Sequence, residues 1–352
     1  MVKVNTIGGK LLFSYNEEET NLSNEIKKQK YLREVNLKGR ELSDIIIEDT
    51  YFHGANFNYV KLENVTFKNC DLSDVDFSHA IFKNVKFIKS EIDRSDFSYT
   101  NFKGGIEFID ITNFDGLVFR FADLSGFDFS NKRFRFICFN HAILRNVNLS
   151  GATITESFID FVNLTNTNLS NTTIIGVTFD NTDFTGADIS GANILSSSFC
   201  RANLLNIKYN EATSFKRVLL IDAKNIPRDL PYPLACPETG KFEAWKKVTA
   251  VVDDDMINPL HTFLVKLEIP EDAKRVSSYS NKCRCSKAMV LEITDLTTNK
   301  QVPQVLNCAY RLSQTLYKVG EMVYPDSFDE DRWNECSNGI HFFKDKESAI
   351  YY

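Results

Sequence analysis

Three side chains near the C-terminus have types that could perform catalysis together. Glu335, Cys336 and His341 lie close in the sequence, and a thiol beside an imidazole and a carboxylate can become an activated nucleophile. Closeness in sequence fixes no geometry, and the stretch Asn-Gly-Ile at 338–340 is equally typical of a turn that leads into a strand. The three residues are therefore catalytic candidates, and a purely structural role stays open.

Metal binding is the second chemistry that the residue types allow. Cys283 and Cys285 form a C-x-C pair, and Cys236 precedes them in the same part of the chain. Structural zinc needs four nitrogen or sulfur ligands, which are usually supplied by two paired knuckles. With one C-x-C pair and no second knuckle, ordinary buried thiols remain the alternative. The chain carries no P-loop, dinucleotide-binding fingerprint or nucleophile elbow, so the sequence indicates no cofactor.

A five-residue rhythm dominates the first two thirds of the chain. Every fifth residue is Phe, Leu, Ile or Tyr from 47 to 102 and again from 114 to 209, and a mostly small residue lies two positions before each. A spacing of two places both side chains on one side of an extended segment, whereas the following step of three reverses the side. The chain must therefore turn a corner every five residues and coil around these side chains. Outward positions such as Ser98 and Thr185 are expected to accept a charge at little cost.

The rhythm is interrupted in the middle. The spacing between Phe102 and Phe114 is twelve residues instead of ten, which predicts a bulge or short loop with two extra residues near 103–105. The coil that follows is expected to be distorted, because bulkier residues hold its small positions: Phe127, Lys132 and Ile137.

Segments such as ADLSG, VNLTN and ADISG resemble the pentapeptide-repeat family, whose motif is A(D/N)LXX. The resemblance covers residues 31–215 and implies a right-handed quadrilateral β-helix with four pentapeptides per coil. About nine coils, spaced ~4.8 Å apart, would make a rod of roughly 40 Å.

The flanking segments have other patterns. Residues 2–15 suggest a hairpin and residues 20–31 a helix with Leu22 and Ile26 on one face. Beyond a proline-rich stretch, four segments resemble strands, at 247–252, 262–269, 287–293 and 316–324. Two more resemble short helices, at 325–335 and 344–352.

The C-terminal stretches at 236–248, 282–293 and 328–343 resemble a domain of unknown function that follows pentapeptide repeats in bacterial and phage proteins. The resemblance supplies boundaries and no activity. The sequence thus predicts a mainly β protein, in which the β-helix lies between a strand-helix cap and an α+β domain. The expected divisions are a cap at 1–30, the β-helix at 31–215, a linker at 216–237 and the α+β domain at 238–352.

Composition limits the partners. The 352 residues are 43% hydrophobic, with a net charge of −6 and eight scattered cysteines. Such mild charge favours neither a polyanion nor an anionic membrane, and no segment approaches the ~20 apolar residues of a membrane span. We therefore expect a cytoplasmic protein without a disulfide framework. Direct nucleic-acid binding is not favoured, because aspartates interrupt the one basic cluster, Arg120, Lys132, Arg133, Arg135 and Arg145.

The favoured function is a non-enzymatic scaffold that binds another protein, with partner and oligomeric state left open. An alternative implied by the resemblance is a DNA mimic that modulates gyrase, topoisomerase or another DNA-binding protein. A ~40 Å rod would need roughly two dozen net negative charges to match duplex DNA, but residues 31–210 hold 22 acidic and 17 basic side chains. Residues 151–190, with five acidic and no basic residues, keep that alternative open. A second alternative is an uncharacterised enzymatic activity in the C-terminal domain.

Overall fold

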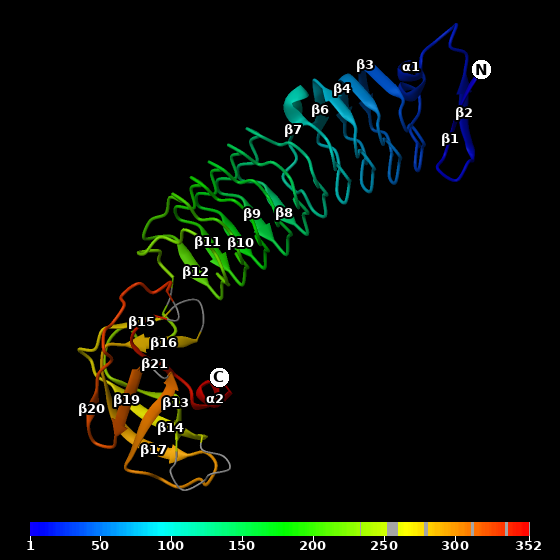
Figure 1. Cartoon of the computed structure of the whole chain (residues 1–352). Coiled ribbons are helices and arrows are strands. Elements are labelled where there is room, and N and C mark those ends of the chain that lie inside the picture. The colour runs from blue at the N-terminus through cyan, green and yellow to red at the C-terminus, as the bar shows by residue number, and fades with distance from the viewer. Residues whose placement is uncertain (233, 252–259, 278–280, 311–312, 335–336, 352) are drawn as a thin grey trace. The chain divides into compact units, whose positions relative to one another are not determined.

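The computed structural model describes residues 1–232, 234–251, 260–277, 281–310, 313–334 and 337–351. It divides into two compact units, Met1–Tyr232 and Pro233–Tyr352 (Figure 1). The first unit is a β-solenoid with a cap at its N-terminal end, and the second is built on an antiparallel sheet.

The N-terminal cap consists of a hairpin and a short helix, as the sequence predicts. Strands β1 (Val2–Asn5) and β2 (Leu11–Tyr15) pair antiparallel, and α1 (Leu22–Lys27) follows. The Asn21 side chain accepts a hydrogen bond from the Asn24 amide at 2.9 Å, which satisfies a free N–H at the helix start. Leu22 and Ile26 are buried. The cap covers apolar side chains and backbone groups that the first coil would otherwise expose.

About nine coils follow, which confirms the predicted solenoid (Figure 1). Their strands pair in parallel with the strand one coil away, in a register of twenty residues through most of the unit. One sheet contains β3 (Glu41–Glu48), β4 (Lys61–Lys68), β5 (Ile81–Lys83), β6 (Val85–Ile88) and β7 (Ile106–Ile109). The other contains β8 (Arg133–Arg135), β9 (Thr153–Thr155), β10 (Thr173–Ile175), β11 (Asn193–Leu195) and β12 (Ser214–Lys216).

Large apolar side chains fill the solenoid from inside. Phe77 is fully buried, and its ring stacks on Phe97 one coil away with centroids 5.0 Å apart. Hydroxyls at the small inward positions bond to the backbone of the preceding coil: Thr167 Oγ1 donates to the Leu144 carbonyl at 2.6 Å. Inward polar groups are thereby satisfied, and the core stays close-packed and otherwise apolar.

Each corner of a coil is formed by a residue with positive φ. Asn64 and Asn166 adopt φ of 55° and 57°, and Gly186 adopts 69°. Such left-handed backbone suits Gly and, next, Asn or Asp, because side chains branched or bulky at Cβ clash with the carbonyl there. Asn, Asp and Gly hold many of these positions, but large side chains hold others, as at Arg94 and Glu156.

Insertions shift the register in the middle of the solenoid, in a segment of residues 102–113 that we term the seam. Lys86 pairs with Glu107, twenty-one residues on, and Asp96 bridges to Val118, twenty-two residues on. The expectation of two extra residues at 103–105 is thus wrong in placement. One residue enters at the 3₁₀ turn η1 (Phe102–Gly104), and the other enters between β7 and residue 113.

A third insertion explains why the repeat rhythm fades in the sequence after Tyr209. Ile194 pairs with Phe215, again twenty-one residues on, while the coils carry on to the bridge between Asn203 and Lys224. The inward phase therefore moves by one residue, and Phe215 and Leu220 are buried in place of residues at the old spacing.

The second unit contains a seven-stranded sheet in the order β15-β16-β21-β13-β14-β17-β20, all antiparallel. Its strands are β13 (Phe242–Val251), β14 (Leu260–Ile269), β15 (Arg275–Ser277), β16 (Lys282–Cys285), β17 (Ala288–Asp295), β20 (Met322–Val323) and β21 (Ile340–Phe343). A separate hairpin is formed by β18 (Gln304–Tyr310) and β19 (Ser313–Lys318), and the helix is α2 (Lys346–Tyr351).

Two local expectations for this unit need correction. The strand expected at 316–324 is split into β19 and β20 around Gly320, whose φ is 82°. The helix expected at 325–335 is absent from its described residues, 325–334. There the Asp329 and Asp331 side chains accept hydrogen bonds from the amides of Asp331 and Trp333. These side chains compete with helical backbone bonds and favour successive turns.

Candidate functional site

Of the three catalytic candidates, the structure describes His341 alone, since Glu335 and Cys336 lie outside the described residues. His341 lies on β21 opposite Arg284 on β16. Its Nε2–H donates to the Ser337 carbonyl at 2.7 Å. Burial, reinforced by the nearby charge of Lys282, lowers the pKa of His341 to about 4. The imidazole is therefore neutral and weakly basic near pH 7, with one ring nitrogen already occupied.

The three metal candidates lie in one hydrophobic core. Cys236, Cys283 and Cys285 are all buried there, and the Cys283 thiol donates a hydrogen bond to the Cys236 sulfur. Burial raises the pKa of Cys285 to about 12, so this thiol stays protonated. Within the described residues, no group of three or more His, Cys, Asp or Glu side chains is arranged to hold a metal ion.

Arg284 is a buried charge that sequence reasoning missed. It is 2% exposed, and its guanidinium donates to the carbonyls of Asp329, Asp331 and Asn334. Because several carbonyl dipoles surround the cation, it holds the loop after β20 against the sheet. Nothing local in the sequence marks it, since the loop lies about fifty residues further along the chain.

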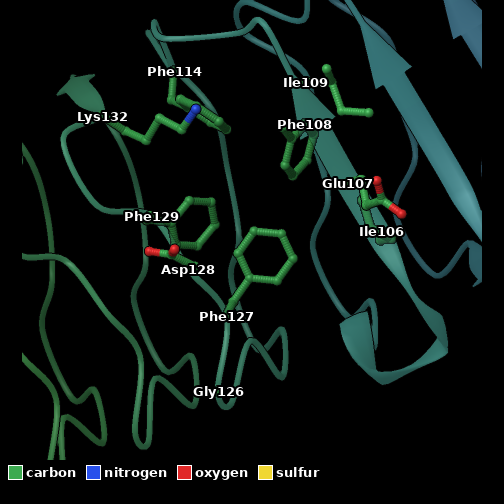
Figure 2. Close-up of a pocket in the computed structure, with 10 residues that line it drawn as sticks. All are labelled: Ile106, Glu107, Phe108, Ile109, Phe114, Gly126, Phe127, Asp128, Phe129 and Lys132. Atoms are coloured by element: carbon green, nitrogen blue, oxygen red, sulfur yellow. The ribbon is translucent and has the colours of Figure 1, made fainter.

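The seam creates two hollows on the solenoid. One, of about 380 Å³, lies where β7 faces residues 126–132, and Figure 2 shows Phe108, Phe127 and Phe129 around it. The Lys132 ammonium donates to the Ile111 carbonyl at 2.7 Å. A second hollow of about 360 Å³ lies between residues 89–93 and 110–113. Both hollows lie beside inserted residues. Phe127 and Lys132, where a distorted coil was expected, line the first hollow, but the register of twenty residues is kept there, from Asp128 with Asn148 to Cys138 with Phe158.

A line of six stacked rings lies at one corner of successive coils. We term it the aromatic ladder, and it comprises Tyr59, His79, Tyr99, Phe121, His141 and Phe161. Neighbouring centroids are 4.5, 4.5, 4.9, 4.8 and 5.0 Å apart, with interplanar angles of 14° or less. All six residues have positive φ, between 57° and 63°. The rings therefore stack face to face along the solenoid, and their edges point outward.

The ladder is open to solvent. Its four Tyr and Phe side chains are 48–55% exposed, and Ile81 and Ile143 on the adjoining face are 58% and 40% exposed. Sequence reasoning missed the ladder because it concentrated on the inward phase. A column of every twentieth residue, corrected by two at the seam, would have revealed it.

Opposite charges pair across coils in the first half of the solenoid. Lys68 lies 2.8 Å from Glu48 and Arg94 lies 2.7 Å from Asp74, and Lys61 and Lys83 pair in the same way with Glu41 and Glu63. The predicted basic cluster is partly engaged too, since Arg135 lies 3.6 Å from Glu156. Exposed pairs of this kind add little stability but cancel the local field.

The fold is a β-solenoid followed by a separate sheet domain. Family models agree: residues 28–97 match a pentapeptide repeat region, residues 133–171 and 167–204 match pentapeptide repeats, and residues 232–349 match a family of unknown function, DUF5758. The chain is a pentapeptide-repeat protein with a C-terminal DUF5758 domain.

Individual relatives add little about function. An uncharacterized protein, L223 of Acanthamoeba polyphaga mimivirus, is 37% identical over 105 residues, which are 28% of this chain and 65% of that protein. HetL, a pentapeptide repeat protein from Nostoc sp. strain PCC 7120 involved in heterocyst differentiation regulation, is 16% identical over 55% of this chain and 86% of its own, with a TM-score of 0.24. QnrB1, a plasmid-mediated fluoroquinolone resistance protein, is 18% identical over 53% and 94%, with a TM-score of 0.25.

In the part of the chain that the structure describes, no helix is both long and apolar enough to cross a membrane.

Proposed function

We propose that this protein is a non-enzymatic scaffold that binds another protein through the aromatic ladder. The observation that carries the proposal is one continuous line of six stacked rings on a solenoid corner, in which the four Tyr and Phe side chains are about half exposed. Contiguous apolar patches on a soluble surface mark interaction sites, and aromatic residues are enriched at such sites.

The solenoid supports this use because its core and its surface are independent. Inward residues such as Phe77 and Phe97 hold the coils, while corner side chains such as Tyr99 project from a fixed backbone. Rings already stacked on one another lose little conformational freedom when a partner covers them. A repeat architecture therefore offers a preorganised contact line.

A second candidate is the DNA mimic, favoured by residues 151–190. Asp160 and Asp180 stack in successive coils there, with Asp160 Oδ1 accepting the Asp180 amide at 2.9 Å. The cross-coil ion pairs of the first half work against an acidic rod. The name of QnrB1 describes fluoroquinolone resistance for that protein, and a gyrase supercoiling assay with the full chain tests such an action here. Unchanged supercoiling at high micromolar protein would remove this candidate.

The ladder proposal is tested by affinity capture with the full chain and two variants. Tyr99→Asn with Phe121→Asn interrupts the ladder at its centre, and Asn suits the left-handed backbone at both positions. Phe136→Asn is the matched control, because Phe136 is also an exposed corner residue, with φ of 56° and 51% exposure, but lies off the ladder. Wild type and control should retain the same bound protein while the double variant loses it. Equal capture by all three would refute the assignment.

A further inference from the structure

We propose that Cys236 and Cys283 form a redox-active thiol pair, which hydrogen peroxide converts into a disulfide inside the C-terminal unit and which small thiols reduce again. The two cysteines lie far apart in the sequence, but both are buried in one core, where Cys236 is 4% exposed and Cys283 0%. The pair belongs to the C-terminal unit, so it is independent of the function proposed for the aromatic ladder.

Backbone and side-chain contacts place the two sulfurs beside each other. Ser277 on β15 lies directly opposite Cys283 on β16, and its Oγ accepts the Ala235 amide at 2.7 Å. The residue after Ala235 is thereby held against Cys283, whose thiol donates a hydrogen bond to the Cys236 sulfur. A disulfide bond is ~2.05 Å long, so two sulfurs already in hydrogen-bond contact need only a small further approach to form it.

The chain after Cys236 is fixed to the same strand. The Arg275 guanidinium on β15 donates to the carbonyls of Pro237 and Gly240 at 3.2 and 2.8 Å. Cys236 therefore lies between two anchors, Ala235 on one side and Pro237 on the other, and both are attached to β15. Because the backbone on either side of Cys236 is held, little further freedom is lost when a bond to Cys283 forms.

The surroundings of the pair divide the two thiols into a nucleophile and a proton holder. The hydrogen bond from Cys283 lowers the pKa of Cys236 against the opposing effect of burial. The positive charges of Arg275 and Arg332 lower the Cys236 pKa further. The same hydrogen bond, together with burial, raises the pKa of Cys283. Since the thiolate is the reactive form of cysteine, Cys236 is the sulfur that attacks an oxidant first.

Arg275 contributes a positive charge that no carboxylate cancels within the described residues. Its hydrogen bonds go to backbone carbonyls, among them those of Pro270 and Glu271 at 2.7 and 2.8 Å, and its guanidinium lies 5.3 Å from the Phe242 ring. Such neutral partners leave the charge in place to favour a thiolate at Cys236.

Cys285 shows that burial in this core does not by itself make a thiol reactive. It lies on the same strand as Cys283, belongs to the same core and is 0% exposed. Its Sγ–H donates to the Ile340 carbonyl at 3.7 Å, and burial raises its pKa to about 12. Cys285 is therefore the matched control for both cysteines of the pair.

The oxidation proceeds in two balanced steps. The Cys236 thiolate attacks one oxygen of hydrogen peroxide and the O–O bond breaks, which leaves a sulfenic acid on Cys236 and a hydroxide ion that takes up a proton to become water. The Cys283 sulfur then attacks the Cys236 sulfur, the S–O bond breaks, and the hydroxyl group leaves as water with the proton of the Cys283 thiol. Two electrons pass from the two sulfurs to the peroxide. Exchange with two equivalents of a monothiol restores both cysteines and leaves the monothiol as its own disulfide.

The new bond stabilises the C-terminal unit. It closes a loop that contains β13, β14 and β15, and a cross-link across such a loop removes freedom from the unfolded chain. The thermal midpoint of the C-terminal unit should therefore rise by roughly 5–15 °C on oxidation. The redox state of one thiol pair thus sets the stability of this unit.

The first test maps the bond in the full chain. The reduced protein is treated with hydrogen peroxide, its remaining thiols are alkylated, and it is digested with trypsin. Trypsin cleaves on both sides of the dipeptide at 283–284, so Cys283 and Cys285 fall in different peptides. We expect a linked peptide that joins Cys236 to Cys283, disappears after reduction by dithiothreitol and also forms in Cys285→Ala. Absence of this link in wild type, or an equal yield of a link from Cys236 to Cys285, would overturn the proposal.

The second test assigns the roles of the two thiols with dimedone, which labels sulfenic acids. After peroxide treatment, Cys283→Ala should carry the label on Cys236, whereas Cys236→Ala should leave Cys283 unlabelled. Label on Cys283 but not on Cys236 would contradict the order of attack. The map of the wild-type protein decides the proposal even where an alanine variant melts early.

Thermal melts test the effect of the bond on stability. The midpoint of the C-terminal unit should rise on oxidation in wild type and in Cys285→Ala, and it should stay in place in Cys236→Ala. A wild type that forms the link without any rise in this midpoint would refute the redox control of stability.

Discussion

The solenoid and the C-terminal unit differ in how far apart in sequence their paired strands lie. In the solenoid, each strand pairs with a segment about twenty residues away, and one small and one large inward side chain recur every five residues. In the C-terminal unit, Trp245 on β13 pairs with Phe343 on β21, almost a hundred residues on. Local repetition therefore determines the first unit, while distant pairing determines the second. We expect them to unfold as separate transitions.

The largest effect should come from removing an inward ring of the solenoid. Phe184 is 1% exposed and lies 5.2 Å from Phe179 and 5.1 Å from Phe199, measured between ring centroids. Phe184→Ala should lower the free energy of unfolding by about 3–5 kcal/mol, because stacked coils cannot collapse into the void. Calorimetry should show the solenoid transition falling while the C-terminal transition stays in place. A loss below about 1 kcal/mol would contradict inward packing at this position.

This difference between the units also decides how much could be predicted from sequence. The inward positions, the coil number and the cap follow from short-range periodicity. Besides the placement of the inserted residues, a second expectation within the repeat is wrong: Ser98, assigned to an outward position, is 5% exposed. Ser98 directly precedes the corner residue Tyr99, and its amide donates to Asp96. The five-residue rhythm indicates whether a residue points inward or outward. It does not show which side chains one coil away cover that residue.

The candidate sites were predicted less well for a physical reason. Cys236 and Cys283 share a core because segments far apart in sequence pack together. Arg284 likewise binds a loop that lies about fifty residues further along the chain. Periodicity contains no information about such contacts. The ladder, in contrast, is periodic at twenty residues, so it was encoded in the sequence.

The seam should be the most sensitive backbone position of the solenoid. A Cβ added at Gly104 would collide with the Phe82 carbonyl, whereas one added at Gly126 would meet open space. Gly104→Ala should therefore cost about 1–3 kcal/mol through forced backbone movement. Gly126→Ala is the control, which should lose only the penalty of its positive φ. If the two variants melt alike in the solenoid transition, close approach at the seam is not limiting.

Acid should lower the free energy of unfolding of the C-terminal unit selectively, through His341. The pKa of His341 is lowered from 6.5 to about 4, chiefly by burial. Between pH 4 and pH 6.5 the His341 imidazole is therefore mostly protonated in the unfolded chain and mostly neutral in the folded chain. Stability from this residue is complete above about pH 6.5 and falls as pH drops towards 4, by roughly 1–3 kcal/mol.

His341→Gln provides the control for this acid effect. Melting curves at pH 7 and pH 5 should show the C-terminal transition shifting in wild type and shifting less in the variant. An identical acid shift in both proteins would exclude His341 as the cause.

The smallest effect is expected where a phenylalanine of the same solenoid faces outward. Phe121 stacks on Tyr99 and His141 at 4.9 and 4.8 Å, but it does so with a φ of 58°. Phe121→Asn removes two stacks and relieves one strained corner, and these terms are of similar size. The free energy of unfolding should change by less than about 1 kcal/mol, in contrast to Phe184→Ala. A loss as large as that of Phe184→Ala would mean that the ladder holds the coils together. Its exposure would then need no partner to explain it.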